Sequence, residues 1–295
     1  MVSQTILHCG GKILEWRWSS NNELLPAPFW TACFLVDGLL IDCGAPDSVD
    51  ELKDFVKNLG ESEQVKKCFI THWHEDHCGG AHMLQEEFGI PVYAGKKAVA
   101  LLNKEKDYPD YRQITWGKHY VPFEAEPIES PISTASGKYT FELFPMVGHS
   151  VDLMAPIEPN EEWAFTTDAV MPKYTMIFGK NTDIPEDLSQ IYDSIQKLYE
   201  YSESMNDLKI FTSGRGVFEG RNFLKEKMEE LEDLHQKAHM YYAQAQQDTP
   251  KEKRRLKYVL RKMFHKESFV GKFTRGDLSN MNLINSLLEW PLNGE

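Results

Sequence analysis

Cysteine is scarce in this sequence and is not arranged in pairs. The 295 residues contain an odd number of cysteines with no Cys-x-x-Cys motif among them: Cys9, Cys33, Cys43, Cys68 and Cys78. Small secreted domains that depend on disulfides carry an even and denser set. We therefore expect no disulfide framework and a reducing compartment.

Long apolar runs are also missing. No stretch of about 18 uncharged apolar residues occurs, which is the length that a transmembrane helix needs. The first residues, MVSQTILHCGGKILEWRW, lack the basic start and the apolar run of a secretory signal. We expect a cytoplasmic protein with no membrane partner.

Positive charge is outnumbered: 32 lysines and arginines stand against 45 aspartates and glutamates, giving a net charge of −13 at pH 7. A surface of this sign repels phosphate backbones, so we expect no extended nucleic-acid binding unless a local basic patch overrides the net charge. Residues 251–264, KEKRRLKYVLRKMF, depart from the average because they are strongly basic. They raise a nucleic-acid hypothesis, but we expect them instead to lie in solvent or beside an acidic face of the preceding segment, formed by Glu226, Glu229, Glu230, Glu232 and Asp233.

Strand and helix patterns alternate along residues 1–219. Alternating or buried apolar runs such as ILEWRW, FWTACFLV and VKKCFITH predict strands, and Asp37-Gly38 predicts a hairpin turn. Residues 47–58 have apolar side chains at helical spacing. Beyond this alternating region the patterns are helical only. We therefore predict two domains, 1–219 and 220–295, of which the second is all-helical.

Two irregular segments are candidates to line a substrate pocket. Residues 104–127 are rich in charge, tyrosine and proline and look like an insertion or lid. A second loop is expected at residues 171–183. Their candidate lining residues are Tyr108, Tyr111, Trp116, Tyr120, Lys173, Tyr174 and Phe178. Ordinary packing of long loops is the alternative interpretation.

The segment THWHEDHCGG, residues 71–80, has the composition of a metal site. His72 and His74 are two residues apart, so in extended chain they project to the same side. Asp76 and His77 follow where the chain turns toward a helix, and the two glycines let that helix start close by without a Cβ clash. Imidazole nitrogens and carboxylate oxygens are ligands for zinc, iron and manganese. The segment therefore predicts two ligands for each of two adjacent ions.

Four separated motifs resemble those of the metallo-β-lactamase fold superfamily. HWHEDH followed by Cys-Gly-Gly is similar to its HxHxDH signature, and LLIDCGAP, VGHSVD and AFTTDAV follow the family's order at residues 39–46, 147–152 and 164–170. The resemblance covers roughly residues 1–219. It implies an α/β fold, an αββα sandwich of two mixed β-sheets flanked by helices, here with an all-α C-terminal extension.

The resemblance also implies a set of metal ligands. The first ion would take imidazoles from His72, His74 and His149, and the second would take Asp76 and His77, with Asp168 between the two ions. Asp76 would also orient the nucleophile and handle its proton. The implied cofactor is a divalent metal, zinc first and iron or manganese as alternatives, with one or two ions bound.

One position departs from the family pattern. The family ends with a histidine ligand in a glycine-rich turn, whereas the corresponding turn here, TSGRG, has Arg215 in that place. Arginine stays protonated and cannot bind a cation. The second site is then weak, or completed by water or substrate, or lost. Arg215 is either a group that grips a substrate carboxylate or phosphate, or a turn residue that faces solvent or pairs with Asp76 or Asp168.

The function that the resemblance implies is metal-dependent hydrolysis. A metal-bound hydroxide would attack a small-molecule ester, thioester, lactone or phosphoester. The alternative is a catalytically weak or inactive protein that uses the same fold for ligand binding or regulation. His235 and His239 are conceivable replacements for the missing ligand. The C-terminal helices are similar to extensions that cover a pocket or form a homodimer interface in other members.

Overall fold

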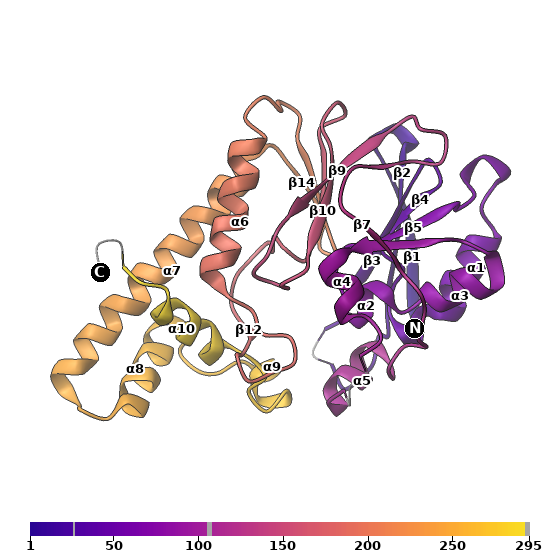
Figure 1. The fold of residues 1–295 in the computed structure, drawn as a ribbon. Helices are drawn as coiled ribbons and strands as arrows, with labels where there is room; N and C mark the ends of the chain where they lie inside the picture. Colours follow the sequence, from indigo (N-terminus) through magenta and orange to yellow (C-terminus); the bar gives the residue numbers. More distant parts are fainter. Residues whose placement is uncertain (26, 105–107, 293–295) are drawn as a thin grey trace. The chain divides into compact units, whose positions relative to one another are not determined.

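The computed structural model describes residues 1–25, 27–104 and 108–292 and divides them into two compact units (Figure 1). The sheet unit comprises Met1–Pro145, Val151–Asp168 and Asp207–Phe218, and the helical unit comprises Met146–Ser150, Ala169–Asn206 and Glu219–Glu295. Residues 105–107 of the expected insertion and 293–295 of the expected extension lie outside the described residues. The domain boundary at 219 and 220 stays a prediction.

The first sheet of the sheet unit has seven strands in sequence order. Strands β1 to β4 are antiparallel, and β4 to β7 are parallel. The hairpin between β3 and β4 turns at Asp37-Gly38, as predicted. The strands are β1 (Val2–His8), β2 (Ile13–Ser19), β3 (Thr31–Val36), β4 (Leu39–Ile41), β5 (Lys67–Ile70), β6 (Val92–Gly95) and β7 (Glu126–Ile128).

The second sheet has six strands in the order β14-β13-β11-β10-β9-β8. Strands β8 to β11 are antiparallel, and β11 pairs in parallel with β13. The strands are β8 (Ile132–Ser133), β9 (Thr140–Pro145), β10 (Met154–Glu158), β11 (Trp163–Thr167), β13 (Lys209–Thr212) and β14 (Gly216–Glu219).

The hydrophobic core of the sheet unit joins these two sheets. Phe165 and Phe211 stack with ring centroids 4.6 Å apart, and Phe34 of the first sheet meets both rings edge-on. All three are fully buried. Burial of large aromatic side chains is the main favourable term at such a contact. The two sheets therefore hold the strand ends in fixed positions, and the candidate site is built on those ends.

Short helices connect the strands of the sheet unit. In α1 (Val49–Lys57), Leu52 and Val56 are buried one turn apart, which is the face that the sequence period predicts. The other helices are α2 (Glu75–Cys78), α3 (Ala81–Phe88), α4 (Lys96–Leu101) and α5 (Asp110–Trp116), and the 3₁₀ turns are η1 (Cys9–Gly11), η2 (Pro46–Ser48) and η3 (Glu61–Glu63).

The helical unit is built on α7, which spans Arg221–Asp248. Helix α8 (Glu252–Phe264) folds back along the C-terminal half of α7 (Figure 1). Ser279 caps α10 by accepting a hydrogen bond from Asn282 N. The remaining elements are α6 (Leu188–Tyr201), α9 (Phe269–Phe273), α10 (Asn280–Glu289) and the two-stranded ribbon of β12 (Ile177–Phe178) and β15 (Leu278–Ser279).

The predicted fold class is confirmed. The structure is α/β with two large mixed sheets and helices, and its C-terminal part is helical. Within the described residues, no helix is long and apolar enough to cross a membrane.

Candidate metal centre

Asp42 anchors the loop that carries the HxHxDH motif. Strand β5 ends at Ile70, and Asp42 Oδ1 accepts a hydrogen bond from the next backbone N–H, that of Thr71, at 2.8 Å. Asp42 Oδ2 accepts from the Thr71 hydroxyl at 2.9 Å and from His77 Nδ1 at 2.7 Å. Asp42 is fully buried and has a φ of 61°, a conformation that aspartate tolerates better than most residues. One carboxylate therefore fixes both ends of the motif.

The same network fixes the orientation of the His72 ring. His72 Nδ1 lies 3.1 Å from the Thr71 hydroxyl oxygen. Because that hydroxyl donates its proton to Asp42, His72 Nδ1–H is the donor toward it, and His72 Nε2 carries the lone pair. His74 Nδ1 lies 3.0 Å from His72 Nε2, and both rings are buried. The two imidazoles converge from neighbouring positions of one loop, as the motif predicted.

His72, His77 and Asp168 each present a ligand atom within 4.8 Å of the others. His77 Nε2 lies 3.2 Å from Asp168 Oδ2 and 3.5 Å from Asp76 Oδ2. A metal-binding histidine characteristically donates its other ring N–H to a carboxylate, which is the arrangement of His77 with Asp42. The donor set of buried imidazoles and carboxylates therefore fits a divalent ion.

The pKa values of His77 and Asp76 are shifted by burial and by the charges of the neighbouring side chains. Burial by itself lowers the pKa of His77, but the carboxylates of Asp42, Asp76 and Asp168 outweigh burial and hold that pKa well above the ordinary value. Burial raises the pKa of Asp76 to about 6, with His77 lowering it and Asp168 raising it. A bound cation would favour neutral His77 and ionised Asp76. Metal and proton therefore compete for this site.

The backbone before Asp168 is strained. Thr167 ends β11 with a φ of 47°, and the register of β11 against β13 shifts between Phe165 and Thr167. A positive φ is rare for a β-branched residue and costs of order 1–3 kcal/mol. Such strain tends to occur where a side chain must be aimed, and here it precedes the carboxylate that meets His77.

Gly79 and Gly80 allow a close backbone contact with the loop after Asp42, whereas the sequence predicted only that they leave room near a metal. A Cβ on Gly79 would lie 2.3 Å from the backbone of Ala45 and Pro46, and a Cβ on Gly80 would lie 2.5 Å from Cys43 O. The two glycines therefore let α2 and α3 pack against the loop that follows Asp42. The requirement arises at that loop, in addition to any requirement for space at a metal.

Two thiols form part of the packing beneath the motif. Cys43 Sγ lies 3.4 Å from His77 O, and Cys78 Sγ lies 3.8 Å from Trp73 O. Both side chains are fully buried, and burial raises the pKa of Cys78 well above the ordinary value. Cys78 therefore stays protonated, and both side chains are buried packing residues.

His149 belongs to the helical unit and is oriented there by Glu186. His149 Nδ1 lies 2.7 Å from Glu186 Oε1, and Glu186 Oε2 accepts a hydrogen bond from Phe178 N at 2.7 Å. Gly148 has a φ of 128°, and a Cβ there would lie 2.4 Å from Ile191 N, so the loop packs tightly on α6. Glu186 was not predicted, because it lies 37 residues from His149 and belongs to no motif of the sequence.

A family comparison agrees with this geometry. The sequence model of the metallo-beta-lactamase superfamily matches residues 31–202, which is more than half of the chain. The chain belongs to the metallo-beta-lactamase superfamily. The match spans all four motifs of the sequence, from the strand before Asp42 to the strand that ends before Asp168.

Curated relatives match parts of the chain. Ribonuclease J 1 of Streptococcus pyogenes is 28% identical over 176 residues, 46% of this chain and 31% of its own length. Beta-lactamase-like protein 2 homolog of Caenorhabditis elegans is 24% identical over 165 residues, with 54% and 47% covered. Probable metallo-hydrolase YflN of Bacillus subtilis is 33% identical over 75 residues, with 25% and 28% covered. The chain thus spans less than half the length of these relatives.

Solved structures share the fold. A metallo-beta-lactamase from Pontibacter korlensis has a TM-score of 0.58 and 19% identity, covering 78% of this chain and 99% of that one. FIM-1 from Pseudomonas aeruginosa, solved in its mono-zinc form, has a TM-score of 0.57 and 15% identity, covering 79% and 96%. At these identities the likeness shows the superfamily fold alone.

Arg215 is exposed on the turn between β13 and β14. It forms no ion pair or hydrogen bond with residues 1–25, 27–104 or 108–292. The turn itself is fixed, because Ser213 N donates to Thr167 O at 3.2 Å and a Cβ on Gly214 would lie 2.7 Å from Trp30 O. The backbone on both sides of Arg215 is therefore held in place, while the Arg215 side chain is exposed to solvent.

Sequence reasoning missed a buried ion pair beside the motif. Arg112 of α5 donates through Nε to Glu75 Oε1 at 2.6 Å and through Nη2 to Glu75 Oε2. The side chains are 6% and 1% exposed, and the guanidinium lies 4.6 Å from the Tyr108 ring centroid. Glu75 occupies a variable position of HxHxDH, so the motif gave no reason to look for a partner.

Three of the six aromatic residues expected to line a pocket are packed in the structure, while Phe178 lines a pocket of the helical unit. Tyr108, Tyr120 and Tyr174 are no more than 5% exposed. Tyr108 stacks on His119 with centroids 5.1 Å apart, and Tyr174 N donates to Glu230. For these three, the packing interpretation of the two irregular segments is the one that the structure supports.

His235 and His239 also have structural partners. His235 Nε2 lies 2.8 Å from Trp290 O, and His239 Nε2 lies 3.0 Å from both Trp290 O and Leu287 O. These carbonyls follow or end α10, where a helix leaves its last carbonyl groups without partners. The two histidines therefore satisfy the end of that helix.

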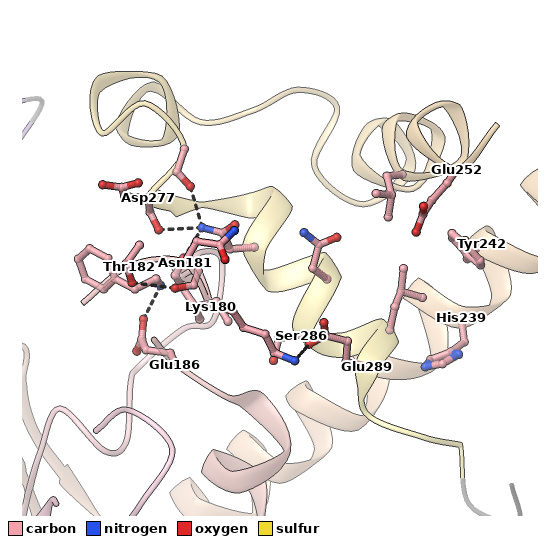
Figure 2. Close-up of a pocket in the computed structure, with 18 of the residues that line it drawn as sticks. Lys180, Asn181, Thr182, Glu186, His239, Tyr242, Glu252, Asp277, Ser286 and Glu289 are labelled. Atoms are coloured by element: carbon pink, nitrogen blue, oxygen red, sulfur yellow. Dashed lines mark hydrogen bonds and ion pairs between the residues drawn. The ribbon is translucent and has the colours of Figure 1, made fainter. Parts of the chain in front are cut away.

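The helical unit contains a pocket of 1320 Å³. In Figure 2, α10 runs between Asn181, Thr182 and Glu186 on one side and His239, Tyr242 and Glu252 on the other. Lys180 pairs with Glu289 at 2.5 Å, and both Glu186 oxygens have partners. The lining carries four carboxylates, those of Glu186, Glu252, Asp277 and Glu289, and two cations, Lys180 and Arg275, so acidic groups outnumber basic ones there.

Proposed function

We propose that this superfamily member is a metal-dependent hydrolase. The observation that carries the proposal is that His77, Asp168 and His72 present ligand atoms within 4.8 Å of one another, with Asp42 bonded to the second nitrogen of His77. The proposed metal is a divalent ion, zinc first and iron or manganese as alternatives, and one or two ions are bound. The first ion is held by His72, His74 and His149. The second is held by Asp76 and His77, and Asp168 is shared between the two.

The residues of the chain have distinct tasks in this proposal. A divalent ion, when bound, would lower the pKa of a bound water toward neutrality and would polarise the substrate oxygen that gains charge. Asp76 would orient that water and accept its proton, and its Oδ2 lies 3.5 Å from His77 Nε2. Asp42 keeps the His77 ring and the Thr71 backbone in place and transfers no proton. Glu186 does the same for His149.

The proposed substrates are small-molecule esters, thioesters, lactones or phosphoesters. They share an electrophilic carbonyl or phosphoryl centre whose oxygen gains charge during hydrolysis, which is the chemistry that such a site assists. We propose that the substrate carries an anionic group, because the exposed Arg215 guanidinium pairs with no carboxylate among the described residues and could bind one on the substrate. We also propose a cytoplasmic location, supported by the five free cysteines, and a homodimer through the C-terminal helices.

Arg215 also supports a second candidate. A protein that lost its last metal ligand would bind a ligand in the same site and act as a catalytically weak or inactive regulator. The two candidates differ in metal content and in turnover, so both are measurable on the purified chain.

The decisive experiment measures metal and turnover together. Protein expressed with added zinc, iron or manganese is analysed for bound metal and assayed on ester, thioester, lactone and phosphodiester substrates. We expect one or two equivalents of metal and hydrolysis of at least one class, with both lost in His74→Ala. His82→Ala is the matched control, because His82 lies on α3 and bonds to Pro122 O. Metal-loaded protein that hydrolyses no class would favour the regulator.

A further inference from the structure

Helix α8 carries positive charge that the helical unit leaves without carboxylate partners. Between Glu252 and Phe264 there are six lysines and arginines and one glutamate. The exposed cations are Lys253, Arg254, Lys257, Arg261 and Lys262. Within the part of the chain that the structure describes, none of them forms an ion pair. A strongly basic surface thus stands on a chain whose net charge is −13.

The acidic residues of α7 do not neutralise α8. Four of the five carboxylates that the sequence placed on this helix have other partners. Glu229 pairs with Lys225 and Asp233 pairs with Lys237, both within α7, while Glu230 binds Lys227 and Tyr174 N, and Glu232 accepts from the Tyr192 hydroxyl. The basic side chains of α8 therefore do not pair with the acidic side chains of α7. The structure has the other placement that we expected, with the basic segment exposed to solvent.

Packing of α8 fixes which side chains remain available. Val259 is fully buried, and Leu256 lines the pocket of Figure 2 together with Glu252. Arg255 donates to Thr249 O at 2.9 Å and to Pro250 O at 3.1 Å, so it holds the turn that precedes α8. The cations on the other side of the helix are therefore presented from an ordered and rigid element.

These cations border a hollow between the end of α7 and α8. Its volume is 330 Å³, within the range of about 300–1,000 Å³ that is usual for ligand pockets. Three cations, one carboxylate and one aromatic ring line it, and its residues are Ala245, Asp248, Thr249, Arg254, Lys257, Tyr258 and Arg261. The Tyr258 ring has the Arg261 guanidinium 5.8 Å and the Lys262 ammonium 5.5 Å from its centroid.

We propose that this surface, defined by Arg254, Lys257, Tyr258 and Arg261, binds single-stranded nucleic acid. The three cations would contact successive phosphates, and a base would stack on the Tyr258 ring. A positively charged groove with an aromatic platform is the arrangement that suits single strands, because unpaired bases are free to stack. The chain's net negative charge opposes a polyanion, so binding should be weak at physiological salt and strongly salt-dependent.

The side chains of α8 favour this ligand over an anionic membrane. Helices that bind membrane surfaces combine basic residues with a broad exposed apolar face. The apolar residues of α8 are buried or half-buried: Leu256, Val259, Leu260, Met263 and Phe264. A flat lipid surface would gain charge contacts without any apolar insertion, whereas a nucleotide also fits the hollow and its ring.

The test is titration of a fluorescent 20-nucleotide oligouridine with the full chain at 25 to 200 mM salt, with EDTA present so that hydrolysis plays no part. The triple variant Arg254→Gln, Lys257→Gln, Arg261→Gln should lose at least tenfold in affinity at low salt. Its log–log slope against salt should be shallower by about 2, since each phosphate contact on a single strand contributes about 0.7. Tyr258→Ala should weaken binding about 5-fold or more with the slope unchanged.

A matched control separates this surface from net charge alone. Lys197→Gln, Lys225→Gln, Lys237→Gln removes the same three charges from exposed positions of α6 and α7 and should bind as the wild type does. The variant Arg254→Lys, Arg261→Lys keeps the charge and should keep the slope. Absence of wild-type binding at 25 mM salt, equal losses in both triple variants, or binding to phosphatidylserine vesicles without binding to oligouridine would each overturn the proposal. Circular dichroism of every variant checks that it folds. His74→Ala should bind oligouridine as the wild type does, so the binding result can be interpreted even if the hydrolase proposal fails.

Discussion

Arg112 and Glu75 form a two-pronged ion pair that is almost fully buried beside the metal-binding loop. The pair ties α5, which lies in the expected insertion, to the first residue of α2. Glu75 is flanked by His74 and Asp76, so whatever holds Glu75 also holds the backbone of two proposed metal ligands. The guanidinium thereby supports the site without belonging to it.

Removing one partner of this pair should be costly. Arg112→Ala would leave the Glu75 carboxylate buried and unpaired, and we expect the free energy of unfolding to fall by about 3–5 kcal/mol. The measurement is urea unfolding of the metal-free protein. The double variant Arg112→Met, Glu75→Leu removes both charges and should recover most of the loss. If Arg112→Ala alone changes the unfolding midpoint little, the pair does not hold the loop.

Asp42 should control metal affinity through His77. Asp42→Asn keeps the shape but removes the charge that orients His77 and Thr71, so we expect metal affinity to fall about 10- to 100-fold. Competition with a chelator of known affinity measures the change. Asp37→Asn is the matched control, since Asp37 accepts two hydroxyl hydrogen bonds at the turn between β3 and β4. A similar loss in both variants would indicate a general destabilisation instead.

Metal binding should release a proton from His77. Its pKa is raised in the metal-free cluster, so His77 is protonated at pH 7 and must become neutral to bind a metal. Apparent metal affinity should therefore rise with pH across neutrality. Near pH 5.5 the release should be larger, because Asp76, with a pKa of about 6, then also carries a proton. Calorimetry of zinc binding in buffers of different ionisation enthalpy counts the protons. The wild type should release about one more at pH 7 than His77→Ala does; equal counts would contradict this account of His77.

Arg215→His should add a metal ligand. The turn follows Thr212, which pairs with Thr167 next to Asp168, so an imidazole at position 215 starts from a backbone already fixed near that carboxylate. We expect metal content to rise, by up to one equivalent, and the second equivalent to bind more tightly than in the wild type. Arg215→Gln is the control for loss of the positive charge. An identical rise in Arg215→Gln would mean that the charge alone opposes the second ion.

The parts of the site that were predictable are local. His72, His74, Asp76 and His77 lie within six residues, and a strand that ends before a helix brings them together without any knowledge of the rest of the chain. The hairpin turn at Asp37-Gly38 is local in the same sense. The LLIDCGAP motif located the strand that ends before Asp42, and the structure shows the three hydrogen bonds by which Asp42 holds the loop.

The contacts that were missed join distant segments. Arg112 meets Glu75 across 37 residues, and Glu186 meets His149 across another 37. Charge matching between the acidic and basic segments failed for a different reason. Composition located the charges on two helices but not their partners, and lysines one turn away within α7 reached two of the carboxylates at i, i+4.

The buried thiols of Cys43 and Cys78 allow local unfolding of the metal-binding loop to be measured. Cys43 and Cys78 contact the backbone carbonyls of His77 and Trp73, and neither sulfur is reachable while that backbone stays in place. A thiol reagent can attack them only during excursions that lift the loop away, and the half-buried Cys9 lies apart from it and gives an internal reference rate. The rate of their modification therefore measures, in solution and residue by residue, how often the metal-binding loop unfolds.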